Sequence, residues 1–246
     1  MVDMHLSLWA PKKITRFLLW IVFFLALMSI IGQVSKYFLG HGSLLGFVRL
    51  FNVDLENNVP TWYSSITLLL ASLILAAIAY AKKIEKDPYR YHWAVLSLLF
   101  FFLSIDEDAS FHECLIAPLK YLGQVSAFFY YAWVIPGIVL VLLFGLFYLR
   151  FLLQLPSRTG FLFFFAGFVY ILGAVVVEMI SGYQASRYGE KNFTYSLIIT
   201  LEEILEMGGI IIFIQALIEY LQVTVSAIHL KIGDQKTLPE SSHDGC

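Results

Sequence analysis

The chain has 246 residues, of which 59% are hydrophobic, 17% aromatic and only 14% charged. Soluble proteins carry about a quarter charged residues, so this composition excludes a cytosolic enzyme, a disordered chain and a secreted disulfide scaffold. The net charge of -2 and the short clusters of Lys and Arg provide no surface for a polyanion. The lipid bilayer is therefore the expected environment, and nucleic acid is not expected as a partner.

Apolar stretches long enough to cross a membrane occur along the whole chain. A spanning helix needs about 20 mostly apolar residues, because the hydrocarbon layer, about 30 Å thick, offers no partner to unpaired backbone groups. Six stretches qualify: 17–38, 62–80, 92–119, 127–149, 160–181 and 194–221. The third and the sixth are long and interrupted by acids. The sequence predicts an all-α, polytopic membrane protein with six transmembrane helices in one bundle.

The distribution of Lys and Arg predicts the orientation of this bundle. These residues stay on the cytoplasmic side when they lie near helix ends. With the N-terminus inside, eleven of them lie on the cytoplasmic side and five on the outer side. Both termini are thus expected in the cytoplasm, in a cell inner (plasma) membrane. Residues 1–232 form the expected transmembrane domain, and the polar residues 233–246 a disordered tail. A membrane-protein partner or a homo-oligomer is left open.

Ionisable residues inside the predicted spans carry the functional information. A charge at bilayer depth costs several kcal/mol, so such residues normally face the bundle interior and have a partner. At 1.5 Å per residue, the acids of the third, fifth and sixth spans all fall between the midplane and the outer surface. None of these three spans contains Lys or Arg. The candidate metal-site residues are Asp106, Asp108, His112, Glu113, Glu178, Glu202, Glu203 and Glu206.

Clustered carboxylates without a basic partner persist in two ways: several of them hold a proton, or they bind a cation. The mixture of one histidine with several acids favours a divalent metal cation. Oxygen-rich ligation with one nitrogen favours Ca, Mn, Fe or Mg over Zn. Asp108 and His112, four residues apart on a helix, are expected to share a face and chelate one ion. Asp54, Glu56 and Asn57 of the first outer loop lie on the same side and are candidates to cap the site.

Simpler explanations of the same residues stay open. The third span can end near Ile105, which would leave an acidic outer loop after it. A later start of the sixth span would leave Glu202 and Glu203 at the wet interface. Glu178 can serve as a local hydrogen-bond acceptor, and His112 as a structural hydrogen bonder. The agreement of these residues in depth and side favours a joint site over these separate roles.

Three functions follow from the cluster as hypotheses. The first is a divalent cation bound near the outer side, with a catalytic or a structural role, so that the enzyme question is left open. The second is a proton- or cation-coupled transporter or channel in which the same acids carry exchangeable protons. The third is an accessory membrane subunit without chemistry, in which neutralised acids would change only stability or partner binding.

Three strings of the sequence resemble a family of uncharacterised multipass bacterial membrane proteins. They are NNVPTWYSS at 57–65, LSIDE at 103–107 with the His-Glu pair at 112–113, and TLEEILEMG at 200–208. The resemblance covers most of the chain, from the first outer loop to Tyr220. It implies an acidic site shared by the family, and it implies no activity.

Overall fold

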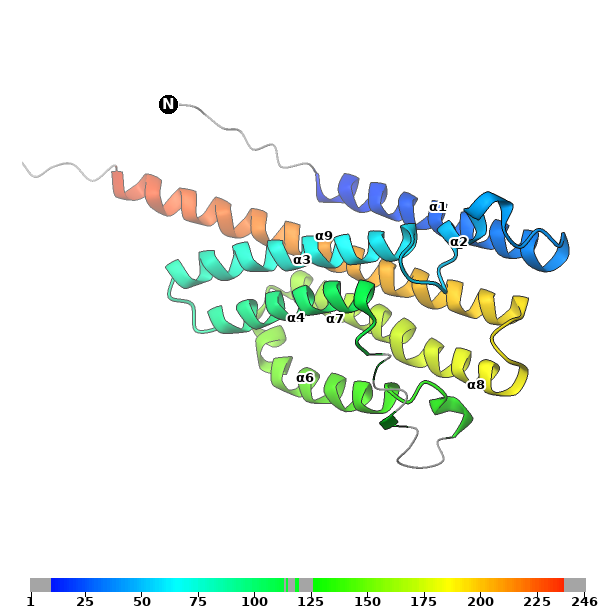
Figure 1. Cartoon of the computed structure of the whole chain (residues 1–246). Coiled ribbons are helices and arrows are strands. Elements are labelled where there is room, and N and C mark those ends of the chain that lie inside the picture. The colour runs from blue at the N-terminus through cyan, green and yellow to red at the C-terminus, as the bar shows by residue number, and fades with distance from the viewer. Residues whose placement is uncertain (1–9, 113, 115–117, 120–125, 237–246) are drawn as a thin grey trace, which may run out of the picture.

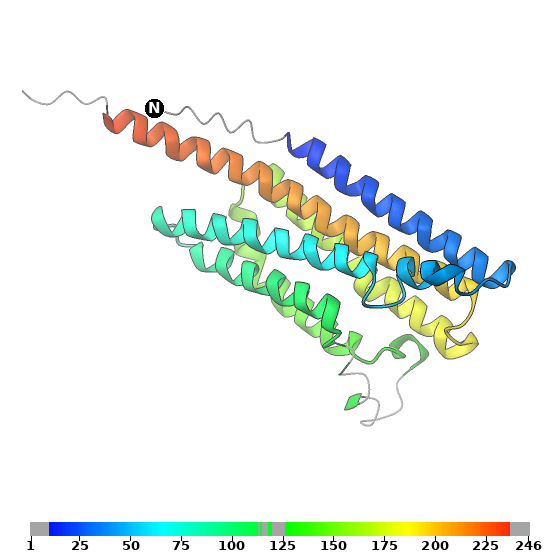
Figure 2. The same ribbon diagram turned by 45° about the horizontal axis from the view of Figure 1, so that its top comes forward.

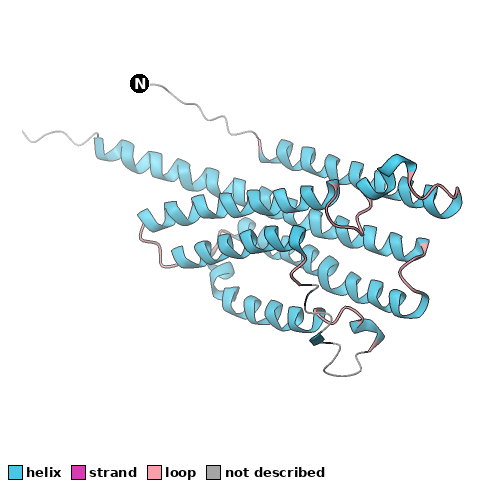
Figure 3. Ribbon diagram, viewed as in Figure 1, coloured by secondary structure: helices cyan, strands magenta, loops and turns pink. Residues whose placement is uncertain are grey.

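The computed structural model describes residues 10–112, 114, 118–119 and 126–236, and in this part of the chain it is helical without strands (Figure 3). A π-helical segment, η4 (Leu172–Val177), joins α7 to α8. The α-helices are α1 (Pro11–Phe38), α2 (Phe47–Phe51), α3 (Val59–Ile84), α4 (Arg90–Ala109), α6 (Val134–Gln154), α7 (Ser157–Ile171), α8 (Glu178–Tyr188) and α9 (Phe193–Lys236). The prediction of an all-helical chain is confirmed for these residues. Of the expected tail, residues 233–236 belong to α9, and residues 237–246 lie outside the described part of the chain.

Four helical segments among the described residues are long and apolar enough to cross a membrane. They are α1, α3, α6 and the continuous segment 157–188, which comprises α7, η4 and α8. These segments coincide with the first, second, fourth and fifth predicted spans. The helices that carry most of the candidate site acids, α4 and α9, are not among the four.

The third predicted span, 92–119, is wrong at its end. α4 ends at Ala109, because Ser110 adopts a left-handed conformation with φ 52°. Its backbone N–H still donates to the Asp106 carbonyl oxygen at 2.7 Å, which closes the last helical turn. The chain then turns away, so that His112 no longer lies on the helix. The alternative of an end near Ile105 is closer to the observed boundary, but Ser is not a residue that favours the left-handed region, so the exact end had no clear sequence signal.

The long helices run side by side along one axis in both views (Figures 1 and 2). α9 lies at the centre and packs against α1, α3, α7 and η4. α1 begins toward the end of the bundle at which α9 ends. At the other end α1 and α4 finish and α3 and α9 begin. We call this the acidic end, because residues 106–108 of α4 and Glu202, Glu203 and Glu206 of α9 lie in that half.

Two pairs of serines fix α4 against α3. Ser65 Oγ donates to the Ser104 carbonyl oxygen at 2.7 Å, and Ser104 Oγ donates back to the Ser65 carbonyl at 2.8 Å. One heptad away, Ser72 and Ser97 repeat the reciprocal arrangement at 2.8 and 2.9 Å. Small hydroxyl residues of this kind let membrane helices approach closely. The register that they set places the acids at the end of α4 beside the start of α3.

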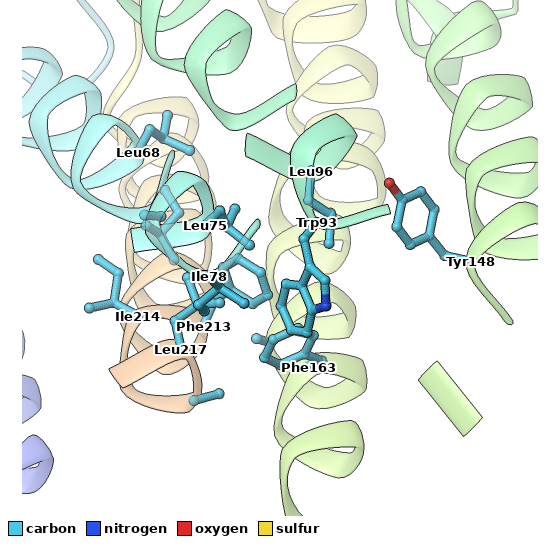
Figure 4. Close-up of a cluster of buried hydrophobic side chains, with 14 of the residues drawn as sticks. Leu68, Leu75, Ile78, Trp93, Leu96, Tyr148, Phe163, Phe213, Ile214 and Leu217 are labelled. Carbon is cyan, nitrogen blue, oxygen red and sulfur yellow. The ribbon is translucent and has the colours of Figure 1, made fainter. Parts of the chain in front are cut away.

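A packed apolar core fills the half of the bundle away from the acidic end (Figure 4). Figure 4 shows Ile78 of α3, Trp93 of α4, Phe163 of α7 and Leu217 of α9 gathered in one cluster, and all four are buried. Trp93 stands edge-on to Phe163, with ring centroids 5.9 Å apart. This core separates the acids from the opposite end of the bundle.

Gly209 allows the backbones of α9 and α7 to touch. A Cβ atom on Gly209 would lie 2.8 Å from the Tyr170 nitrogen and 2.9 Å from the Ala166 carbonyl oxygen. Real Cβ atoms do not approach backbone this closely, so the contact requires glycine. The neighbouring Gly208 has open space around the same position, with nothing within 4 Å.

We therefore expect Gly209→Ala to lower the melting temperature of the purified protein by several degrees, because overpacking typically costs about 1–3 kcal/mol. Gly208→Ala is the matched control and should leave the melting temperature unchanged or slightly raised, since alanine favours the helix. Thermal unfolding in detergent measures both. Equal melting temperatures for the two variants would show that α7 and α9 do not meet at Gly209.

Candidate functional site

The acids of α9 form the centre of the candidate site. Glu202 is buried, with 8% of its surface exposed, and Glu203 and Glu206 are half-buried. The Glu203 carboxylate interacts electrostatically with Glu107 on α4 and with Glu178 at the start of α8. Glu206 has the same two partners. The structure thus places acids from three helices within electrostatic range of one another.

Glu107 belongs to this cluster although the sequence analysis did not single it out as a site residue. Ser64 of α3, His112 and Asp106 interact with its carboxylate electrostatically. Ser104, one helical turn earlier, is buried against α3. Positions three apart share a helix face, so the small polar Ser104 was a signal that Glu107 faces the bundle.

His112 pairs with Asp106 and not with Asp108, contrary to the chelating pair predicted from helical spacing. The His112 backbone N–H donates to Asp106 Oδ1 at 3.0 Å, and His112 Nδ1 lies 2.8 Å from Asp106 Oδ2. Asp108 is exposed. The physical reason is the end of α4 at Ala109, which moves His112 off the helix face that Asp108 occupies. Glu113 lies outside the described residues.

Trp133, directly before α6, connects this pair to α8. Its indole Nε1 donates to Glu178 Oε1 at 2.8 Å. Its ring meets the His112 ring edge-on, with centroids 4.9 Å apart. Trp133 falls within the fourth predicted span, 127–149, near its outer end, and nothing in the sequence places it beside α8. The contact gives Glu178 a hydrogen-bond donor that carries no charge.

The π-helical segment η4 presses directly against the acids of α9. A Cβ atom on Gly173 would lie 2.8 Å from the Glu202 carbonyl oxygen and 2.9 Å from Glu206 Cγ. Glycine is therefore required for this approach. π-Helical turns are rare and often occur at functional sites. Here the π-helical turn immediately precedes Glu178 and so positions that residue beside the acids of α9.

The loop between α2 and α3 (residues 52–58) covers the cluster at the acidic end. Asp54 interacts electrostatically with both Glu202 and Glu203. Glu56 accepts a hydrogen bond from the Ser110 hydroxyl. These contacts place two of the three expected capping residues beside the acids. The third, Asn57, supplies the turn with its positive φ of 56°.

Side-chain hydrogen bonds hold this loop in place. Gln33 Nε2 of α1 donates to Asn52 Oδ1 at 2.5 Å. Asn58 caps α3 by accepting from the Thr61 backbone N–H at 3.1 Å. Its Nδ2 also donates to the Asn52 carbonyl oxygen at 2.6 Å and to that of Leu55. These hydrogen bonds give the loop a defined conformation over the cluster.

Asn58→Ala is expected to expose the amides of the loop, because it removes both the helix cap and the two donated bonds, a loss of about 1–3 kcal/mol. Asn58→Asp keeps the capping oxygen and loses only the donated bonds, so it should fall between wild type and Asn58→Ala. Hydrogen exchange of residues 52–58, read by mass spectrometry, checks this order. Wild-type protection in Asn58→Ala would mean that the loop is held by other contacts.

Tyrosines line the edge of the cluster next to α8. The Tyr131 hydroxyl lies 2.7 Å from that of Tyr195. A Cβ atom on Gly182 would come within 3.3 Å of the Tyr131 ring, so α8 packs closely here. Burial raises the pKa of the Tyr131 hydroxyl above its usual range, and the negative charges of Glu190 and Asp54 add to the effect. Tyr131 therefore remains a neutral hydrogen-bonding group.

The donor geometry does not fit a ready-made metal site. Across the residues that the structure describes, no group of three or more His, Cys, Asp and Glu side chains comes together in a way that could hold a metal ion. We therefore do not assign the predicted residues as metal ligands.

This arrangement of acids is chemically suited to holding and exchanging protons. The strongest electrostatic partners of Glu203 and Glu206 are acids. Like charges close together repel one another, so each negative charge in the cluster opposes the next. Within the described part of the chain, Glu202 Oε2 is buried without a hydrogen-bond partner. A site of this kind accepts small cations, of which the proton needs no coordination shell.

Comparison with known proteins identifies a family but no activity. A family model described as a domain of unknown function (DUF8692) matches residues 16–220. No curated protein and no solved structure matches the chain.

Proposed function

Because the chain belongs to DUF8692, a family whose description assigns no function, we propose one from the site: the carboxylate cluster binds and releases protons in a proton-coupled membrane transporter. The observation that carries this proposal is the set of mutually interacting acids Glu107, Glu203 and Glu206. Acids inside a membrane are costly, and in many membrane proteins they mark ion paths and proton relays. The cluster contains several such acids in succession.

The proposed transporter has six membrane spans. α4 packs along α3, and α9 along α1, α3 and α7, so both run through the same layer as the four apolar segments (Figures 1 and 2). The 20 residues of α4 extend over about 30 Å, which suffices for the hydrocarbon layer. Most Lys and Arg belong to the end opposite the acids, which supports a cytoplasmic position for that end and for both termini. The acids then face the outer side of a plasma membrane.

A proton fits this site better than a divalent cation. The hypothesis of a bound metal depended on the convergence of His112 and the acids at one level. His112 is instead engaged with Asp106 at 2.8 Å, and the acids of α9 interact with partners on several different elements. A series of neighbouring carboxyl groups on several elements suits stepwise proton transfer. A divalent metal is the alternative occupant and makes a different experimental prediction.

Proteoliposomes that contain a pH-sensitive dye test the proposal. Under an imposed pH gradient, with Na⁺ or K⁺ supplied on the other side, we expect proton movement that is faster than in empty liposomes and depends on pH. Metal analysis of the purified protein runs in parallel. Absence of proton movement, together with a stoichiometric metal that Glu202→Gln plus Glu206→Gln removes, would favour the divalent-cation hypothesis instead.

A further inference from the structure

We propose that Glu202 and Glu178 form a carboxyl pair that shares one exchangeable proton, with Glu202 Oε2 as the binding atom and Trp133 as the positioning residue of Glu178. This inference depends on the proposed function and deepens it, because it names the residues that hold a proton. Two carboxyl groups bind a shared proton by a simple exchange. The O–H bond of one acid breaks as the carboxylate oxygen of the other accepts the proton, with no change in oxidation state.

The first observation is the unpartnered oxygen of Glu202. The residue is 8% exposed, and among the described residues no hydrogen bond reaches Oε2. A buried polar atom without a partner is destabilising, and a buried carboxylate more so. We therefore expect Glu202 Oε2 to bind a proton or another small cation. Glu178 is the second member of the pair, because the η4 turn that directly precedes it packs against the Glu202 carbonyl oxygen and its negative charge acts on Glu202.

The second observation is how firmly Glu178 is held. The π-helical segment η4 directly precedes it, and Gly173 in that segment packs against the Glu202 carbonyl oxygen. Trp133 Nε1 donates to Glu178 Oε1 at 2.8 Å. Ser181, which is fully buried, donates to the Glu178 carbonyl oxygen at 3.0 Å. Glu178 therefore faces α9 on a rigid support, as a binding group must.

The groups around the pair determine its charge. Glu202 faces Glu203 on its own helix, Asp54 from the α2–α3 loop, and the hydroxyl of Ser181 on α8. Glu178 also acts on Glu203 and Glu206 of α9 and on Tyr131 before α6. These charged neighbours are acids. A second negative charge on the pair is thus opposed from several sides, and one shared proton relieves it.

The indole N–H of Trp133 affects how tightly the pair holds its proton. A hydrogen bond from a neutral donor stabilises the ionised form of a carboxyl group. Removal of the indole N–H should therefore make the pair hold its proton more tightly without removing the binding site. Phenylalanine keeps an aromatic ring next to His112 and lacks the donor, so Trp133→Phe isolates this contribution.

Difference potentiometric titration of the purified protein in detergent tests the inference. We expect Glu202→Gln to release one proton fewer than wild type, and Asp108→Asn, which removes an exposed acid, to leave the proton of the pair in place. Trp133→Phe should release the same number as wild type but hold the shared proton about tenfold more tightly. If Glu202→Gln does not fold, Glu178→Gln should show the same missing proton.

The outcomes separate the two proposals. Wild type that releases no proton beyond its surface groups would overturn the proposed function. Proton release by wild type that is unchanged in both Glu202→Gln and Glu178→Gln would overturn only the pair. A Trp133→Phe curve that superimposes on wild type would remove Trp133 from its positioning role. Stoichiometric Mn²⁺ binding that Glu202→Gln abolishes would overturn the proton as the occupant.

Discussion

Glu206→Gln is expected to abolish pH-dependent proton movement in proteoliposomes. Its carboxylate interacts with Glu203, Glu202 and Glu107, so it connects the acids of α9 to α4. Gln has nearly the same shape, which matters because Glu206 Cγ packs against Gly173. The variant thus removes an exchangeable proton while it preserves the packing. A dye-loaded liposome assay measures the rate, and we expect it to fall to that of empty liposomes.

Two further variants serve as a control and as a second test of this result. Asp108→Asn is the matched control, because Asp108 lies on α4 near the cluster but is exposed, and it should keep wild-type transport. Asp106→Asn should also abolish transport, since Asp106 holds His112 at 2.8 Å and interacts with Glu107. Transport at the wild-type rate in Glu206→Gln would exclude this acid from the path. Equal loss in all three variants would indicate a general effect on folding.

Glu203→Gln is expected to stabilise the protein, and more so at alkaline than at acidic pH. Glu203 faces Glu107, Glu178 and Asp54, so its charge is repelled from three sides. As the pH rises, more of these groups lose their protons and the repulsion grows. Loss of one charge should then raise the free energy of unfolding by about 1–3 kcal/mol. Melting temperatures measured in acidic and alkaline buffer give both the sign and the trend.

Glu219→Gln provides a control on the same helix with the opposite expectation. Arg158 donates to the Glu219 carboxylate with Nε at 3.0 Å and with a second guanidinium nitrogen at 3.2 Å. This acid has a positive partner, so its neutralisation should leave stability unchanged or slightly lower. A Glu203→Gln variant that melts below wild type at alkaline pH would mean that Glu203 makes a stabilising contact, and it would argue for a structural cluster.

Hydrophobic patterning predicts the helices of this protein well because each span needs a long apolar run. The four clean stretches of the sequence coincide with four helical segments that are apolar enough to cross a membrane. Patterning fails where the chain leaves a helix for a local reason. The end of α4 depends on the left-handed backbone of Ser110 and on the Asp106 side chain that accepts from His112, and neither feature has a periodic signal.

The candidate site could be predicted only in part, for a similar reason. Glu202, Glu203 and Glu206 of α9 were evident because charge inside an apolar run is costly. The pairing of each acid was not evident, because it depends on the rotation of helices about one another. Glu107 and Trp133 join the site through contacts with Ser64 and Glu178, which lie more than forty residues away in the sequence. Spacing along one helix cannot report such contacts.

Infrared difference spectroscopy of the reconstituted protein, between acidic and alkaline buffer, tests most directly whether the buried acids hold exchangeable protons. We expect a C=O stretching band of protonated carboxyl groups at neutral pH that disappears as the pH rises. In Glu203→Gln plus Glu206→Gln most of this band should be missing. A wild-type spectrum with only ionised carboxylates at neutral pH, or a band of full size in the double variant, would contradict proton storage by the cluster.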